Sequence, residues 1–279
     1  MVNHIIPKTL TEALDWMNQG AYQVISGGTD WMVQARNWAE TLPKATKGLI
    51  FIHNLSELNY IKETAEDLLI GATTPMDVLM NSPKVPQVLR DTLLEIAAPG
   101  IRHMATLAGN IANASPAADG LCTLVALDAT VVIASVNSTR IEHVNDIILA
   151  PKRTNLGENE LIIEIRIPKS DRSFTAFYKV GGRKADAISK VSLAGSVTYE
   201  SDQISAWRIA FGAVGPKVVL NPDIDRMMIG RSVKAVKQDV ASIVRLYEPF
   251  IKPIDDQRST AAYRKQVALN LIGRFIENM

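Results

Sequence analysis

The pattern of hydrophobic and polar positions predicts a helix near the start of the chain. Thr9 and Glu12 form a capping-box pattern at its beginning. Four apolar residues then recur three or four positions apart, on one helical face: Leu10, Ala13, Leu14 and Met17. The same spacing predicts a second helix over residues 84–97, with an apolar face made by Val85, Val88, Leu89, Leu93 and Ile96. Two more helices are predicted near the end of the chain, over residues 233–247 and 259–277.

Short runs rich in β-branched and other apolar residues predict strands between these helices. Five lie in the first part of the chain, at residues 21–26, 48–54, 66–72, 128–136 and 160–168. Three more, at residues 174–180, 191–199 and 203–214, are typical of an antiparallel sheet. Residues 37–47 are polar and are expected to form an exposed loop. The pattern as a whole predicts an α+β fold with a domain boundary at Pro168-Lys169-Ser170-Asp171.

Composition narrows the classes of function. The chain has 279 residues, 47% of them hydrophobic, which is enough for a globular core. Its 30 basic and 29 acidic residues give a net charge of +1, so no electrostatic footprint for nucleic acid is present. Cys122 is the single cysteine, and the four histidines show no ligand spacing, so we expect no metal in this chain. Without a membrane-length apolar run or a signal-peptide pattern, a cytoplasmic protein is expected.

Two segments of small residues are the candidate binding elements. Ser26, Gly27, Gly28, Thr29 and Asp30 follow a predicted strand, and their backbone N–H groups could form a concavity for anionic oxygens. Residues 104–120 show no long apolar period and include Thr106, Gly109, Asn110, Pro116 and Asp119. Either segment alone could equally be a structural turn. The dinucleotide fingerprint of the Rossmann fold and the P-loop pattern are absent from both, so a dinucleotide here would need another fold.

The two segments together carry a family resemblance. "SGGTD" followed by "TLAGNIANASPAAD" resembles the paired FAD-binding motifs of the molybdenum hydroxylase flavoprotein subunits, in the xanthine dehydrogenase and carbon monoxide dehydrogenase family. The resemblance continues through "NELIIEIRIP", "FYKVGGRKADAISKVS" and "RSTAAYRKQVALNLIGRF". It implies an FAD-binding domain of the vanillyl-alcohol oxidase and p-cresol methylhydroxylase type over residues 1–170, with α+β subdomains of roughly 1–55 and 56–170. Residues 171–279 would form a carbon monoxide dehydrogenase flavoprotein-like domain with a three-stranded antiparallel sheet.

The resemblance also implies which residues bind FAD. Around the pyrophosphate it places Gly27, Gly28, Thr29 and Asp30, flanked by Ser26 and Trp31, and a second turn made by Thr106, Leu107, Ala108, Gly109 and Asn110. Asp119 would accept hydrogen bonds from hydroxyls of the cofactor, although it could instead cap a helix. Ile96 and Ile162 match apolar positions near the cofactor, and an ordinary core role suits both equally well. Ala108 departs from the family glycine and brings a Cβ to the second turn.

Three further residues match family positions beside the flavin ring. Asp186 would accept a hydrogen bond from N3 of the ring, and Lys179 would contact the cofactor. Lys190 would lie near the N1–C2 edge, where its positive charge would raise the reduction potential. The alternative for a lysine in such a polar loop is a solvated surface position.

The function implied is an FAD-carrying electron-transfer subunit of a molybdenum-containing hydroxylase. Non-covalent FAD is expected, because no histidine or cysteine matches a covalent attachment point. One cysteine cannot hold a [2Fe–2S] cluster. An iron–sulfur subunit and a molybdopterin subunit are therefore expected partners, in a dimer of heterotrimers, with NAD, a quinone or oxygen as acceptor. The alternatives are a self-contained FAD-dependent oxidoreductase of the same superfamily and a nucleotide-binding assembly protein.

Overall fold

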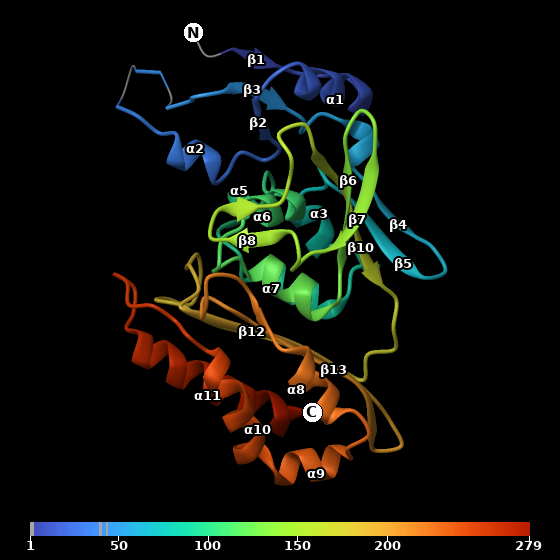
Figure 1. The fold of residues 1–279 in the computed structure, drawn as a ribbon, viewed down its shortest axis with the longest axis vertical. Coiled ribbons are helices and arrows are strands. Elements are labelled where there is room, and N and C mark those ends of the chain that lie inside the picture. The colour runs from blue at the N-terminus through green and yellow to red at the C-terminus, as the bar shows by residue number, and fades with distance from the viewer. Residues whose placement is uncertain (1–2, 39–40, 43) are drawn as a thin grey trace.

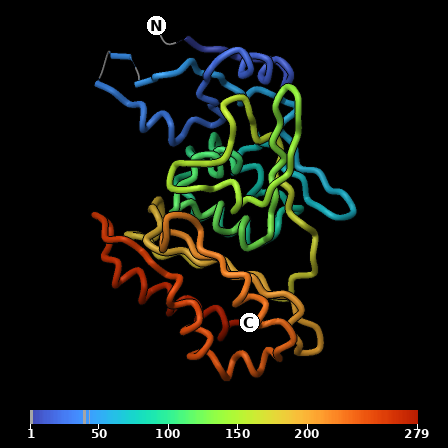
Figure 2. The backbone as a smooth tube through the Cα atoms, viewed as in Figure 1, coloured from blue at the N-terminus to red at the C-terminus, as the bar shows by residue number. Residues whose placement is uncertain are grey.

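The chain is elongated, with its N-terminus near one end and the C-terminal helices at the other (Figure 1, Figure 2). This computed structural model describes residues 3–38, 41–42 and 44–279. Part of the predicted loop at residues 37–47 lies outside the described residues. Within the described part of the chain, no helix has the length and apolarity needed to cross a membrane.

A small sheet and one helix form the N-terminal end. Strands β1 (His4–Ile5), β2 (Tyr22–Ile25) and β3 (Gly48–Phe51) pair in parallel in the order β1-β3-β2. Helix α1 (Leu10–Gln19) confirms the first predicted helix, and it buries Ala13, Leu14 and Met17. The hydroxyl of Thr9 accepts the N–H of Glu12 at 3.1 Å, whereas the Glu12 carboxylate accepts from the Lys8 N–H at 2.8 Å. Two backbone N–H groups at the start of the helix are therefore satisfied by side-chain oxygens. Helix α2 (Trp31–Gln34) follows β2.

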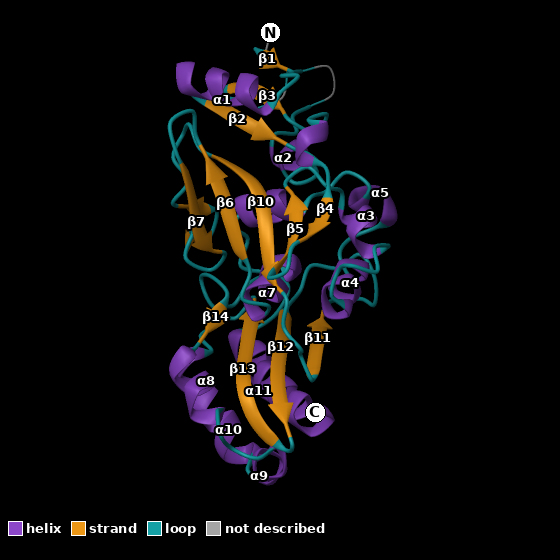
Figure 3. Cartoon of the chain, turned by 90° about the vertical axis from the view of Figure 1, so that its right-hand side faces the viewer, coloured by secondary structure: helices purple, strands orange, loops and turns teal. Residues whose placement is uncertain are grey.

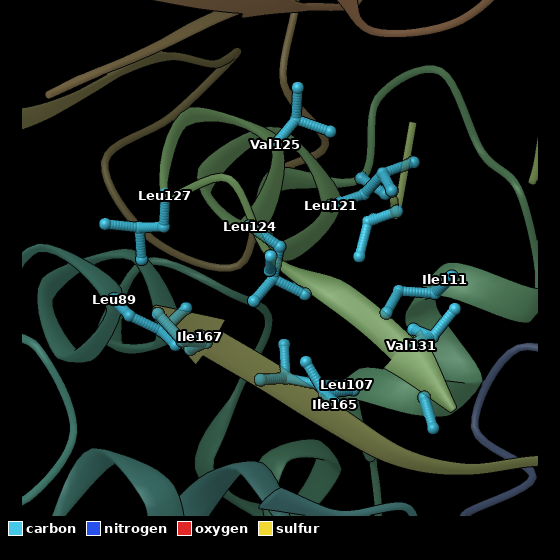
Figure 4. Packing of buried hydrophobic residues seen from close by; sticks show 14 of the residues in the cluster. Leu89, Leu107, Ile111, Leu121, Leu124, Val125, Leu127, Val131, Ile165 and Ile167 are labelled. Carbon is cyan, nitrogen blue, oxygen red and sulfur yellow. The ribbon is translucent and has the colours of Figure 1, made fainter. Parts of the chain in front are cut away.

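A five-stranded antiparallel sheet forms the middle of the molecule. Its order is β4-β5-β10-β6-β7. The strands are β4 (Ile61–Glu63), β5 (Asp67–Gly71), β6 (Thr130–Ala134), β7 (Thr139–His143) and β10 (Leu161–Pro168), and β8 (Ile148–Ala150) with β9 (Arg153–Thr154) forms a separate pair. The helices of this region are α3 (Met76–Met80), α4 (Gln87–Leu94), α5 (Pro99–Arg102), α6 (Leu107–Ala112) and α7 (Asp119–Ala126). Leu107 of α6, Val131 of β6 and Ile165 of β10 belong to one buried cluster (Figure 4).

Two expectations for this region were wrong in detail. The helix predicted over residues 84–97 is shorter at both ends. It begins at Gln87 because Pro86 occupies the N-cap and disfavours helical backbone in the residue before it, and it ends at Leu94, before Ala97, whose φ of 46° is not helical. Residues 104–120, which show no long apolar period, nevertheless contain α6 and the start of α7. Helix α6 has six residues, too few for a readable period, and it forms because Leu107, Ala108 and Ile111 are buried.

A second antiparallel sheet forms the C-terminal region. It contains β11 (Phe174–Val180), β12 (Val191–Glu200), β13 (Gln203–Gly212) and β14 (Val219–Leu220), in that order. One face carries α8 (Pro222–Met228), α10 (Val240–Tyr247) and α11 (Ala261–Asn278), while α7 packs against β12 and β13 from the middle region (Figure 1, Figure 3). The ring of Phe275 in α11 lies directly on Gly195 of β12, where an added Cβ would come within 2.3 Å of the ring.

The three predicted strands of this sheet are confirmed, and the structure adds the short β14. The single helix predicted over residues 233–247 is two helices, α9 (Val233–Gln238) and α10. They break at Asp239, whose backbone at φ −113° and ψ 23° is not helical. Its carboxylate is held by Arg231 at 2.8 Å. Helix α8 was not predicted, and α11 matches the last predicted helix closely.

Candidate cofactor-binding site

Two adjoining hollows form one groove along the middle region. The smaller, of about 370 Å³, lies where the segment after β2 meets the start of α6. The larger, of about 680 Å³, extends to the C-terminal region. Five residues line both hollows: Asp30, Ile96, Asn110, Asn113 and Lys152. The groove is therefore continuous and elongated, and each hollow lies in the volume range of small-molecule sites.

The first glycine segment forms a tight bend at one side of the smaller hollow. Gly28 has a positive φ of 69°, a conformation that favours glycine. Its carbonyl accepts the N–H of Met32 at 2.9 Å, which turns the chain into α2. Gly27 lies so close to the other segment that an added Cβ would stand 1.9 Å from the Met104 carbonyl oxygen. The two small-residue segments are therefore in direct backbone contact, which requires a glycine at position 27.

The second segment is the beginning of a helix, not the turn that was expected. Thr106 is the N-cap of α6, and its hydroxyl accepts the Gly109 N–H at 3.1 Å. The same hydroxyl lies 3.4 Å from the Ser26 hydroxyl and joins the two segments. The side chains of Leu107 and Ala108 are buried in the core, so only their backbone is available to a ligand. Their N–H groups belong to the first helical turn, which has no intrahelical acceptor.

Asn110 and Asp30 contribute polar side chains from the two segments. The Asn110 side-chain oxygen accepts the N–H of Leu121 at 3.1 Å and so ties α6 to α7. The carboxylate of Asp30 lies 3.0 Å from Lys152 Nζ. Lys152 also donates to the Asn113 side chain at 2.7 Å, which places its charge in the part of the groove common to both hollows.

Asp119 and Lys179 form a buried ion pair in the wall of the larger hollow. Lys179 Nζ lies 2.8 Å from Asp119 Oδ2, and the two side chains are only 7% and 5% exposed. Lys179 also donates to the Glu95 carbonyl at 2.7 Å, and Ser189 donates to Asp119 Oδ1 at 2.6 Å. The helix-cap alternative for Asp119 is wrong, because Ala118 is the N-cap of α7 and the Asp119 carboxylate caps nothing.

The remaining expected residues are divided between groove and core. Trp31, Thr29 and Ser26 line the smaller hollow, and Asp186 lines the larger one, exposed and paired with Arg183 at 3.3 Å. As the described residues define them, the hollows do not include Ile162 or Lys190. Ile162 is buried in the core within β10, and Lys190 Nζ lies 5.5 Å from the ring centre of Tyr263.

Lys152 and Ser189 are among the polar residues of this site that were missed from the sequence. Lys152 occupies the turn between β8 and β9 and has a positive φ of 61°. No local sequence pattern predicts this backbone conformation for a lysine. Ser189 lies inside the matched stretch "KADAISKV", yet only the three-dimensional contact with Asp119 distinguishes it from any other serine.

The residues present fit a dinucleotide with a flavin ring. One side of the groove presents backbone from a glycine bend and a helix start, and charged side chains of both signs line it. Gly27 and Gly28 of the bend both line the smaller hollow. An elongated ligand with a diphosphate needs these backbone donors and the neighbouring positive charge of Lys152.

Comparison with known families identifies this class of protein. Residues 1–170 match the model described as the FAD binding domain in molybdopterin dehydrogenase, and residues 176–279 match the carbon monoxide dehydrogenase flavoprotein C-terminal domain. The chain belongs to this family of FAD-binding subunits of molybdenum hydroxylases. It is a subunit of an FAD-dependent oxidoreductase, and its cofactor is FAD.

Individual relatives share most of their length with the chain. It is 31% identical to the glyceraldehyde dehydrogenase medium chain of Sulfolobus acidocaldarius over 225 residues, which cover 78% of each chain. It is 30% identical to the nicotinate dehydrogenase FAD-subunit of Eubacterium barkeri, over 80% of this chain and 78% of that one. A chain in a solved structure of carbon monoxide dehydrogenase from Hydrogenophaga pseudoflava superposes with a TM-score of 0.88 at 25% identity, covering 99% and 96% of the two chains. The expected fold class is thereby confirmed.

Proposed function

We propose that this chain carries electrons within a molybdenum-containing dehydrogenase, receiving them from an iron–sulfur partner and passing them to NAD or another acceptor. The observation that supports this most is the continuous groove, which runs from the two contacting backbone segments to the ion pair of Lys179 and Asp119. Such a groove can hold the diphosphate at one end and the redox-active ring at the other. FAD, when bound, supplies chemistry that accepts and releases electrons.

The two backbone segments would hold the diphosphate. The bend at Gly27 and Gly28 and the start of α6 present N–H groups to the smaller hollow, and Lys152 adds a positive charge. Thr29 and Thr106 would position these donors, the second through its contacts with Ser26 and Gly109. The diphosphate would therefore meet backbone donors and one lysine, with few other side chains between them.

Lys179, Asp119 and Asp186 would face the other end of the cofactor. Ser189 fixes Asp119 Oδ1 and Lys179 fixes Asp119 Oδ2. The carboxylate could therefore accept hydrogen bonds from cofactor hydroxyls without changing its orientation. Lys179 brings a positive charge into a water-poor position, where it would favour the anionic form of a nearby group. Asp186 would accept a hydrogen bond from the ring edge, as the family resemblance implies.

The division into an FAD-binding domain over residues 1–170 and a second domain over 171–279 is part of this proposal. The sheet β11-β12-β13-β14 has its own buried cluster, distinct from the cluster of the middle region. Lys179 would then be a residue of the second domain that reaches the cofactor bound by the first.

The names of the relatives support the need for partner chains. They are called a medium chain and an FAD-subunit, which are parts of larger enzymes. The single cysteine, Cys122, is buried and cannot supply the four ligands of an iron–sulfur cluster. We therefore propose separate iron–sulfur and molybdopterin subunits, arranged as a dimer of heterotrimers.

Purification alone and with partners tests the proposal. The isolated chain should be yellow, should release FAD into the supernatant on acid precipitation, and should hydroxylate no substrate. Co-expression with the two partner subunits should restore substrate-dependent flavin reduction. A colourless chain that still assembles with partners would favour the assembly-protein alternative. A lone chain that turns over substrate would favour the self-contained oxidoreductase.

A further inference from the structure

One buried arginine holds the segment that connects α4 to α5 and forms part of the groove wall. Arg102, the last residue of α5, is only 6% exposed. Its Nη1 donates to the carbonyls of Ile96 at 2.6 Å and Ala97 at 2.9 Å, with a longer contact of 3.4 Å to the Leu94 carbonyl. Ile96 lines both hollows, and Ala97 lines the larger one. As the described residues define the hollows, Arg102 borders neither, so it acts on the groove only through this segment.

Lys179 holds the same segment from strand β11. The Glu95 carbonyl accepts from Lys179 Nζ at 2.7 Å, and Lys179 is paired with Asp119 in the wall of the larger hollow. The four consecutive carbonyls of residues 94–97 are therefore bound by two cationic side chains. A displacement of the segment would move the carbonyl that Lys179 binds, and this couples Arg102 to the ion pair.

The backbone of this segment has a conformation that needs such support. Ala97 has a positive φ of 46°, in the left-handed region that is unfavourable for a residue with a Cβ. The carbonyls of Ile96 and Ala97 belong to the two peptide groups that flank the Ala97 Cα, and both accept from Arg102. Without these bonds Ala97 would relax to a more favourable conformation, and the wall of the groove would change shape.

The burial of this guanidinium costs the fold free energy. Among the described residues, no carboxylate forms an ion pair with Arg102, and its Nε has no hydrogen-bond partner. The carbonyl of Leu94 at the end of α4 offsets part of the charge. An apolar side chain would fill the same space without the desolvation of a charge. The contribution of Arg102 is therefore the shape that it gives to the groove wall.

We propose that Arg102 is a positioning residue for FAD, which fixes the wall of residues 94–97 and, through the Glu95 carbonyl, sets where Lys179 lies beside the cofactor. This inference rests on the proposed placement of FAD in the groove and extends it to a residue outside the groove. Arg102 thereby controls the affinity for FAD. It also controls the reduction potential of the bound cofactor, through the position of the Lys179 charge.

Calorimetric titration of the FAD-free full chain with FAD tests the effect on affinity. We expect Arg102→Met to raise the Kd for FAD roughly tenfold or more, because two short hydrogen bonds to the wall are lost. Arg102→Lys keeps the charge and a donor, so its Kd should fall between those of Arg102→Met and the wild type. If Arg102→Met does not fold, Arg102→Lys alone decides, and its Kd should still exceed that of the wild type. Circular dichroism of the FAD-free proteins shows which variants are folded.

Arg172→Met is the matched control for this titration. Arg172 is also a partly buried arginine, and it donates to two carbonyls, those of Leu127 at 3.3 Å and Pro168 at 2.7 Å. It is not among the described residues that line the two hollows of the groove. Arg172→Met should therefore leave the Kd for FAD unchanged, although it removes a comparable set of hydrogen bonds.

A redox titration of the FAD-loaded variants separates positioning from charge. Arg102→Lys keeps the positive charge, and we expect its potential to be lower than that of the wild type because Lys179 is displaced. In a Lys179→Met background the same exchange should change the potential far less, since the group that it displaces is absent. Arg172→Lys should leave the potential at the wild-type value.

Four results would overturn the inference. They are a wild-type Kd for FAD in the folded Arg102 variants, an equal rise of the Kd in Arg172→Met, a wild-type potential in Arg102→Lys, and an equal fall of the potential with and without Lys179. If the wild type binds FAD and the Arg102 variants bind it as tightly, only this inference fails. If the wild type binds no FAD, the proposed function fails and the inference fails with it.

Discussion

Lys179 Nζ lies 2.8 Å from Asp119 Oδ2, in an ion pair that joins the C-terminal sheet to the central helix α7. Both side chains are more than nine-tenths buried. Ser189 and the Glu95 carbonyl complete the hydrogen bonding of the pair. The pair therefore links α7 to β11, and the geometry of the proposed ring site depends on this link.

Lys179→Met should destabilise the chain because it leaves the Asp119 carboxylate buried without its countercharge. Breaking a buried pair from one side typically costs about 3–5 kcal/mol. Urea unfolding of the FAD-free protein measures the free energy of unfolding. Lys265→Met, which breaks an exposed pair with Glu248, is the control and should move the urea midpoint far less.

The double variant Lys179→Met/Asp119→Asn should recover part of the loss, since the uncompensated charge is then removed. An unfolding free energy of Lys179→Met equal to that of the wild type would show that water reaches the pair freely, and the groove would then be more open than its burial indicates.

Gly27→Ala should separate the two backbone segments and abolish FAD binding. The added Cβ would stand 1.9 Å from the Met104 carbonyl oxygen, far inside contact distance, so one segment must move. Gly100→Ala is the matched control, because a Cβ there has nothing within 4 Å. FAD content after purification, read from the absorbance ratio, compares the two. Full FAD content in Gly27→Ala would show that the contact between the segments is not needed for the cofactor.

Asp225 should make the stability of the C-terminal region depend on pH. Burial raises the pKa of Asp225 to about 7, and the positive charge of Arg208 lowers it only in part. Between about pH 4, near the carboxyl pKa of an unfolded chain, and about pH 7, the unfolded chain releases this proton while the folded chain keeps it. The unfolded state then binds fewer protons, so the free energy of unfolding falls as pH rises through this window and levels off above it.

Asp225→Asn removes this dependence, since an amide does not ionise. Its unfolding free energy should fall less than that of the wild type over the same window, by a few kcal/mol in total. Urea unfolding at about pH 5 and about pH 7.5 measures the difference. Asp223→Asn, with an 83% exposed side chain, is the control. Parallel pH profiles of Asp225→Asn and the wild type would mean that Asp225 ionises normally in the folded chain.

Lys179 and Lys190 should differ in their effect on the reduction potential of bound FAD. Lys179 lines the groove, whereas Lys190 lies over the ring of Tyr263. Lys179→Met should lower the potential by an amount worth about 1–2 kcal/mol, because a positive charge near the reduced ring is lost. Lys190→Met should lower it less. A redox titration of both FAD-loaded variants measures this, and a larger drop in Lys190→Met would restore the role that the family resemblance gives to Lys190.

Local sequence patterns predicted the elements whose own residues stabilise them. Helix α1 has a capping pair and a complete apolar face, and β11, β12 and β13 are long runs with strand-forming residues. In contrast, α6 has six residues and β14 has two, so each forms mainly because neighbouring elements pack against it. The break at Asp239 likewise interrupts an apolar pattern that runs on without a glycine or proline.

The sequence by itself determined the family and the cofactor, because the two motif segments are each contiguous and keep their order of residue types. The tertiary structure decided how those segments meet. The contact of Gly27 with Met104, the pairing of Asp30 with Lys152 and the ion pair of Asp119 with Lys179 each join residues far apart along the chain. The sequence likewise could not show where the side chains of Ile162 and Lys190 lie. Their positions depend on which face of a folded strand or loop each side chain occupies. Residue type and local order are given by the sequence, whereas the neighbours of a side chain are fixed only when distant segments pack together.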